Sequence, residues 1–97
     1  ISILDSGQTE IAKHFATPPE IRGDIDPKHI DTIEDIPVIA NAIATMFCNV
    51  SAAHKAGDHT VFIGEVKAIE VGEGDPLVWF QRQFGVFADQ NSSKQSD

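Results

Sequence analysis

Two long runs of strand-forming residues, separated by a short turn, constrain the fold of this chain most. Residues 60–71 (TVFIGEVKAIEV) are rich in Val, Ile and Phe, and residues 42–53 contain β-branched and aromatic residues without Gly or Pro. Between them, residues 55–58 (KAGD) have the composition of a tight turn. The alanines in 42–53 also permit a helix, but the spacing favours two antiparallel strands.

Shorter strands are predicted at both ends of the chain. Residues 72–75 (GEGD) predict a second turn, after which 77–81 and 84–87 are apolar enough for two more strands. Residues 1–4 (ISIL) have the composition of a strand that is already under way. The strands from 42 onward predict an antiparallel meander. Three strands bury little surface and leave open edges, so we expect further strands from a preceding segment or a partner chain.

One short helix is predicted near the start of the chain. Asp5 and Gln8 have the spacing of a capping box, and Ile11 and Phe15 are four residues apart and therefore share a face. A Pro-Pro pair follows Thr17, so the helix should end there.

The segments beyond the helix and the strands are predicted to be irregular. Residues 19–37 contain six acidic residues and isolated isoleucines, which permit either a helical turn or a long packed loop. Residues 88–97 are polar and are expected to be a disordered tail. A single domain spanning 1–87 is therefore predicted.

Composition and charge exclude several classes of partner. The chain has 97 residues with 15 acidic and 7 basic side chains, a formal net charge of −8. This balance argues against binding to nucleic acid or to an anionic membrane surface. Cys48 is the single cysteine, so no internal disulfide can form, and a reducing compartment is the simpler interpretation. With nothing that resembles a signal peptide, we expect a cytoplasmic location.

The predicted hairpin resembles a known family. Residues 53–66 (AHKAGDHTVFIGEV) resemble the signature hairpin of the flavin reductase family, the small NAD(P)H:flavin oxidoreductases with an FMN-binding split-barrel fold. Residues 8–16 (QTEIAKHFA) are similar to the family's helix, which ends in an aromatic-Ala pair. Residues 74–80 (GDPLVWF) are similar to its last barrel strand. The resemblance spans roughly residues 1–87.

This resemblance implies a fold, an activity and partners. The fold is mostly β with a short helix, a β-barrel of the split-barrel type of which the chain covers only part. The activity is hydride transfer from NAD(P)H to FMN or FAD, with close stacking of the two rings. Homodimers with flavin near the subunit interface, and a partner monooxygenase that receives the reduced flavin, are also implied. The alternative is a non-catalytic β-barrel fragment that binds a flavin or a partner and acts as a dimerisation module.

The hairpin carries three candidate site residues. The resemblance places His59 beside the flavin and nicotinamide rings as the catalytic candidate, whereas the alternative is a histidine hydrogen-bonded to its turn. Asp58 either stabilises the turn or holds one tautomer of His59. Gly64 either allows a ligand to approach the backbone or marks a β-bulge.

Other candidates lie in the helix and near the C-terminus. Phe15 and Ala16 are implied to contact the flavin through their backbone, and Phe84 to stack on its ring. Packing in the core is the default for an aromatic residue such as Phe84. Arg22 could reach a phosphate, although a solvated surface position is favoured. His54 and His59 alone are too few ligands for zinc, so no metal site is expected.

The sequence departs from the family pattern in two places. Residues 81–84 (QRQF) stand where the family often has Arg-Gly-Arg-Tyr, so Arg82 replaces a usual glycine and Phe84 lacks a hydroxyl group. The Ser/Thr-rich loops that hold the flavin phosphate in the family belong to early strands that precede the matched part.

Overall fold

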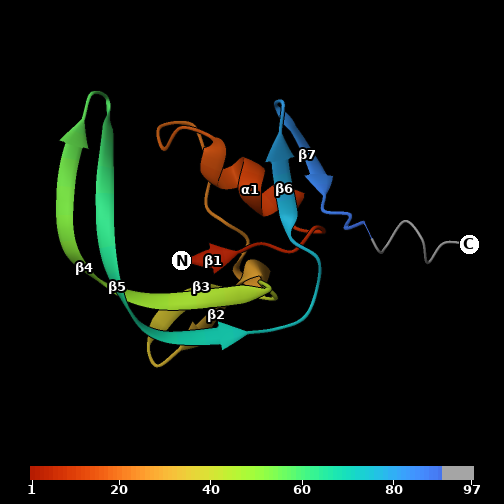
Figure 1. The fold of residues 1–97 in the computed structure, drawn as a ribbon, viewed down its shortest axis with the longest axis horizontal. Coiled ribbons are helices and arrows are strands. Elements are labelled where there is room, and N and C mark those ends of the chain that lie inside the picture. The colour runs from red at the N-terminus through yellow and green to blue at the C-terminus, as the bar shows by residue number, and fades with distance from the viewer. Residues whose placement is uncertain (91–97) are drawn as a thin grey trace, which may run out of the picture.

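A computed structural model describes residues 1–90 of the chain, and the last seven residues of the predicted polar tail lie outside this part. Its elements, in chain order, are β1 (Ser2–Ile3), α1 (Thr9–Ala16), a 3-10 helix (Pro27–His29), β2 (Ile30–Ile33), β3 (Ile36–Ile39), β4 (Ala44–Ala56), β5 (His59–Val71), β6 (Leu77–Phe80) and β7 (Gln83–Val86). The predicted class, mostly β with one short α-helix, is confirmed (Figure 1).

The predicted central hairpin is the largest element of the fold. β4 and β5 pair antiparallel along 13 residues each, and β1 adds to the other edge of β4. Ala56 pairs with His59, so the turn consists of Gly57 and Asp58, with Gly57 at a φ of +65°. A positive φ at the first of two central residues suits a Gly-X hairpin turn. The prediction of two strands around this turn is confirmed, and the helical alternative for 42–53 is wrong.

The hairpin is irregular next to Gly64. The register shifts between Phe47 and Cys48 and again between Val50 and Ala52, and Gly64 pairs with Val50. A Cβ atom at Gly64 would lie 3.2 Å from the Cβ of Cys48, which is tighter than ordinary contact. The bulge interpretation thus has direct support, because the close approach of β4 accounts for a glycine at this position.

The predicted acidic loop is partly wrong, because residues 30–39 form a second hairpin. β2 pairs antiparallel with β3 through Ile30 with Ile39 and Ile33 with Ile36. The turn residues Glu34 and Asp35 have φ values of +49° and +66°. Two successive positive φ values are typical of a type I′ turn, which usually carries Asn-Gly. The sequence lacks that signal, so the hairpin could not be recognised from it.

The predicted meander is also wrong at its C-terminal end. β6 does not join β5 but pairs with β7 in a separate two-stranded sheet. The start of β6 is attached instead to the segment after β1, where the Leu77 amide donates to the Leu4 carbonyl at 2.9 Å. Ser6 donates in the same way to Asp75 at 2.8 Å. The two ends of the domain are therefore joined through backbone hydrogen bonds.

α1 begins later than its capping signal. Gln8, not Asp5, is the residue that precedes the helix. The predicted contact nevertheless forms, because the Gln8 side chain accepts from the Asp5 amide at 2.9 Å. The same side chain donates to the Ala40 carbonyl at 2.7 Å, which connects the start of α1 to the end of β3. The predicted end at Thr17 is confirmed.

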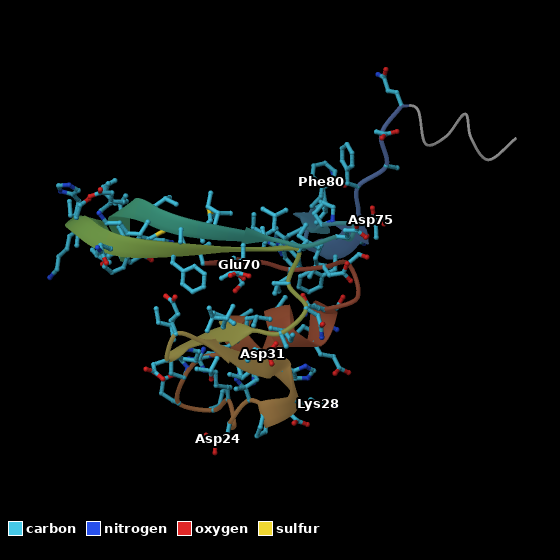
Figure 2. All side chains as sticks on the ribbon, turned by 90° about the horizontal axis from the view of Figure 1, so that it is seen from below. Asp24, Lys28, Asp31, Glu70, Asp75 and Phe80 are labelled. Atoms are coloured by element: carbon cyan, nitrogen blue, oxygen red, sulfur yellow. The ribbon has the colours of Figure 1, made fainter. Side chains whose placement is uncertain are left out.

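Few side chains are buried. Within residues 1–90, the buried apolar residues are Ile11 and Ala40, at 3% and 7% exposure, and Thr45 is buried at 8%. Figure 2 shows the long hairpin as one layer, with α1 and the β2–β3 hairpin below it. Every residue of β5 is exposed, including six large apolar side chains (Val61, Phe62, Ile63, Val66, Ile69 and Val71). The hairpin therefore presents apolar surface that the described residues do not cover.

Candidate functional site

A groove between α1 and the β6–β7 hairpin brings together two of the predicted site residues. It has a volume of about 1130 Å³ and contains Ala16 on the helix side and Phe84 on the sheet side. The other residues that line it are Thr9, Ala12, Lys13, Thr17, Trp79, Arg82 and Gln83. In Figure 1, α1 and β6 lie side by side. The volume suits a ligand of cofactor size.

The helix wall of the groove follows from the spacing of its residues. Thr9, Ala12, Lys13 and Ala16 are three or four positions apart and therefore lie on one face of α1. Three of these side chains are small, so a ligand can approach the helix closely. Lys13 supplies the charge on this face. The spacing shows that these residues share a face but not that this face meets β6–β7, so Lys13 was not predicted as a site residue.

The sheet wall ends in a strained turn. Phe80 pairs with Gln83, so Gln81 and Arg82 are the two turn residues, at φ values of +51° and +63°. This left-handed conformation costs a residue with a side chain on the order of 1 kcal/mol, whereas glycine adopts it freely. Arg82 lines the groove and Gln81 does not. The departure from the family pattern thus places a guanidinium group at the groove.

The aromatic residues of the groove form a partly exposed platform. The rings of Trp79 and Phe84 meet edge to face, with their centroids 4.8 Å apart. Trp79 remains 60% exposed and Phe84 is half-buried. Core packing therefore accounts for only part of Phe84, and the rings remain accessible to a planar ligand.

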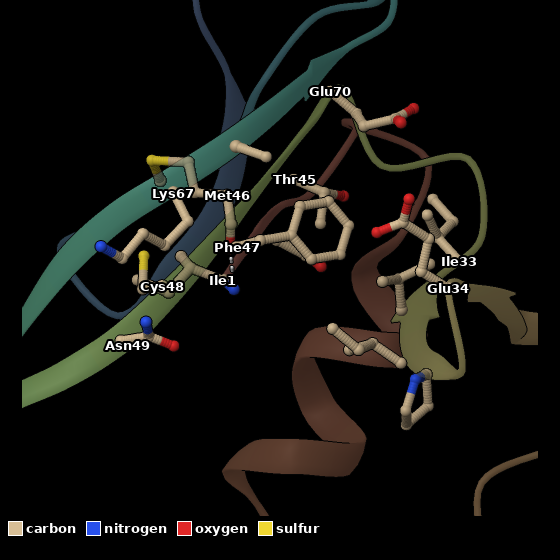
Figure 3. Close-up of a pocket in the computed structure, with 15 residues that line it drawn as sticks. Ile1, Ile33, Glu34, Thr45, Met46, Phe47, Cys48, Asn49, Lys67 and Glu70 are labelled. Atoms are coloured by element: carbon tan, nitrogen blue, oxygen red, sulfur yellow. Dashed lines mark hydrogen bonds between the residues drawn. The ribbon is translucent and has the colours of Figure 1, made fainter.

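A second cleft lies between the β4–β5 hairpin and the β2–β3 hairpin (Figure 3), with a volume of about 490 Å³. Figure 3 shows the ring of Phe47 pointing into it, toward Glu34. Glu34 and Glu70 both line this cleft, and Lys67 is paired with Glu65 at 2.8 Å. None of the predicted site residues lines it. Its carboxylates make it a poor place for a phosphate-bearing cofactor.

Phe15 lies just outside the groove and is held by Arg22. The Arg22 guanidinium carbon lies 5.3 Å from the centroid of the Phe15 ring, and its Nη1 donates to the Phe15 carbonyl at 3.3 Å. Phe15 is still 49% exposed, so its ring remains accessible. The favoured surface position for Arg22 was too simple, because this residue packs on Phe15 rather than only meeting solvent.

His59 and Asp58 lie at the turn of the long hairpin. The Nδ1 of His59 is 2.6 Å from the Oδ1 of Asp58, the arrangement expected if the carboxylate fixes the ring tautomer. The His59 side chain is 80% exposed. β5 begins at His59, and Figure 1 shows that this turn stands apart from α1 and from β6–β7. A single copy of the chain therefore does not bring His59 to the groove.

No group of three or more His, Cys, Asp and Glu side chains within residues 1–90 is placed to hold a metal ion. No helix in this range is long and apolar enough to cross a membrane.

Comparison with known proteins is consistent with this arrangement. The family model for the flavin reductase like domain matches residues 1–88. The NADH-dependent FMN reductase SmoA of Agrobacterium fabrum is 36% identical over 90 residues, which are 93% of this chain and 51% of that protein. The reductase component of the 4-hydroxyphenylacetate 3-monooxygenase of Thermus thermophilus is 35% identical over 85 residues, which are 87% of this chain and 51% of that protein.

Solved structures give the same result for the fold. The flavin reductase PheA2 matches with a TM-score of 0.74 at 35% identity, over 91% of this chain and 56% of that one. The styrene monooxygenase flavin reductase of Pseudomonas putida matches with a TM-score of 0.76 at 25% identity, over 90% and 55%. The chain thus spans about half the length of these relatives. It belongs to the flavin reductase family and has the fold of part of a split barrel.

Proposed function

We propose that this chain acts in an NAD(P)H-dependent flavin reductase, in which a hydride passes from the nicotinamide to FMN or FAD. The observation that carries the proposal is the groove between α1 and β6–β7, which Ala16 and Phe84 line from opposite walls. Family membership and the names of the relatives, an FMN reductase that uses NADH and a reductase component of a monooxygenase, support the same activity.

The residues of the groove suit a flavin. Phe84 and Trp79 offer ring surface on which a planar group can stack, and the small residues of α1 leave room for close approach. Phe15, held by Arg22, presents its ring at the end of the same helix. When bound, the flavin supplies the hydride acceptor, so these residues have only to bind and orient the two rings.

A second copy of the chain would complete the site. His59 stands at a hairpin turn that lies apart from the groove of its own chain, and β5 exposes six large apolar side chains. A homodimer in which the turn of one copy reaches the groove of the other would cover apolar surface and bring His59 to the ligand. Asp58 would then orient the ring of His59 through its 2.6 Å contact.

We also infer a partner monooxygenase that receives the reduced flavin, because two relatives are named as reductase components of monooxygenases. The free thiol of Cys48 suits a reducing compartment, which supports a cytoplasmic location.

A mixing experiment tests the shared site. His59→Ala removes the imidazole, and Ala16→Glu places a carboxylate in the groove at an exposed helical position, so that each variant alone should be inactive. In a mixture, the dimer with one copy of each has one intact site, and about a quarter of the wild-type NADH oxidation should return. A mixture that stays inactive, although both variants fold and dimerise, would rule out sites built from two copies.

A further inference from the structure

We propose that Lys13 and Arg82 form an anion subsite in the groove between α1 and β6–β7, which recognises the phosphate group of a ring-bearing nucleotide. The inference rests on the proposed function, because it assigns one chemical group of the ligand to the same groove. Two observations carry it: the charges on the two walls of the groove and the rings beside the two cations.

The charge of the groove is opposite to that of the chain. The chain has 15 acidic and 7 basic residues, yet no acidic residue lines this groove and two basic ones do. Lys13 lies on the helix wall and Arg82 on the sheet wall. Within residues 1–90, neither has a carboxylate oxygen within 4.0 Å, whereas Lys28 and Lys67 do. An anion between the walls would give both cations their missing partner.

Arg82 contributes a guanidinium group to the groove. Its planar fork can bind two phosphate oxygens at once. Arg82 has a φ of +63° in a two-residue turn, a conformation that glycine adopts without strain, so the guanidinium can be removed by a glycine substitution that suits the turn.

The rings of Trp79 and Phe84 specify the rest of the ligand. They line the same groove as the two cations and contact each other edge to face. The groove therefore suits a planar aromatic group joined to a phosphate. FMN and the nicotinamide nucleotides share this chemistry, and the test must separate these two sources.

The test compares ligands that differ by one phosphate group. FMN and riboflavin share the flavin ring system, and titration by flavin fluorescence gives the affinity of each for the chain. We expect FMN to bind at least about tenfold more tightly than riboflavin, as a charge-assisted contact would provide. Added salt should weaken the binding of FMN and leave that of riboflavin nearly unchanged.

The variants separate binding from folding. Arg82→Gly removes the guanidinium and relieves the strained turn, so a loss of affinity for FMN cannot be attributed to unfolding. Gln81→Gly is the matched control. It relieves the backbone strain at the neighbouring turn residue, whose φ is +51°, and it changes no residue that lines the groove. We expect Arg82→Gly to lower the affinity for FMN to that for riboflavin, and Gln81→Gly to retain the preference. Lys13→Gln should have part of the effect, with Lys55→Gln as its control on the distant hairpin.

Competition by nicotinamide mononucleotide and by nicotinamide riboside tests the other ligand, because these two compounds differ by the phosphate group of a nicotinamide nucleotide. A preference for the mononucleotide that Arg82→Gly abolishes supports the subsite with the dinucleotide as its ligand, even where FMN and riboflavin bind equally. If FMN binds no more tightly than riboflavin, and the mononucleotide no more tightly than the riboside, the anion subsite is wrong. The proposed flavin site would not be affected by that result. A folded chain that binds neither flavin would overturn the proposed function itself.

Discussion

The guanidinium group of Arg22 stacks 5.3 Å from the centroid of the Phe15 ring and donates a hydrogen bond to the Phe15 carbonyl at 3.3 Å. The Arg22 side chain thus contacts both the ring and the backbone of Phe15, the residue before the last one of α1. The contact satisfies one of the last carbonyls of the helix, which have no partner within the helix itself. It also adds positive charge at the C-terminal end of α1, where a cation is favourable.

Arg22→Ala should lower the free energy of unfolding by about 1 kcal/mol, because a cation–π contact and a charged hydrogen bond are lost at a partly exposed site. Urea denaturation followed by circular dichroism measures the change. Arg22→Lys keeps the charge without the planar stacking group and should lose only part of this energy. An alanine variant as stable as the parent would show that the contact contributes nothing.

Gly74→Ala should destabilise the chain by about 2 kcal/mol or more. Gly74 has a φ of +141°, and a Cβ atom there would collide with the side chains of Asp5 and Ile43. These contacts lie where the segment after β1 meets the start of β6. Gly23→Ala is the matched control, since a Cβ atom at Gly23 meets nothing within 4 Å. If thermal denaturation finds the two variants equally stable, the account of this junction is wrong.

Gln8→Ala should cost about 1–2 kcal/mol of stability, because one side chain serves two backbone groups on different elements. It accepts from the Asp5 amide and donates to the Ala40 carbonyl, and Ala40 is among the few buried residues. Glu10→Ala, an exposed change in the first turn of α1, should stay within about 0.5 kcal/mol of the parent. The same urea experiment compares the two, and equal costs would contradict the assigned role of Gln8.

The sequence predicted those elements whose signals are local. The Gly57-Asp58 turn between two β-rich runs identified the long hairpin, and the Pro-Pro pair identified the end of α1. The β2–β3 hairpin was missed because Glu34 and Asp35 occupy its turn in place of Asn-Gly. The separation of β6 from β5 was missed because β6 is attached instead through distant backbone contacts, such as Leu77 with Leu4, that leave no local pattern.

The candidate site was predicted in part for a similar reason. Resemblance to a family supplied Ala16 and Phe84, and both line one groove. The contribution of Lys13 depends on which face of α1 meets β6–β7, and that is decided by tertiary packing. The separation of His59 from the groove could not be predicted from the sequence, because it depends on how far the hairpin extends. Which residues form a site together is thus set by elements that are far apart in the chain.

Replacement of the two hairpin histidines should have different effects on activity. His54 and His59 lie on opposite strands of the same hairpin, at the pairs His54 with Val61 and Ala56 with His59. His59→Ala should lower flavin-dependent NADH oxidation at least about tenfold if its ring orients the nicotinamide, whereas His54→Ala should change it by less than about twofold. Equal losses in both variants would indicate an effect on the hairpin as a whole.

The most direct test of the central claim is the rate of NADH oxidation by the purified chain in the presence of FMN, followed by NADH absorbance. We expect a rate that saturates with FMN concentration, exceeds that of FMN and NADH without protein, and falls at least about tenfold in His59→Ala. A folded chain that binds FMN but gives no rate above the protein-free mixture would contradict the reductase function of this polypeptide.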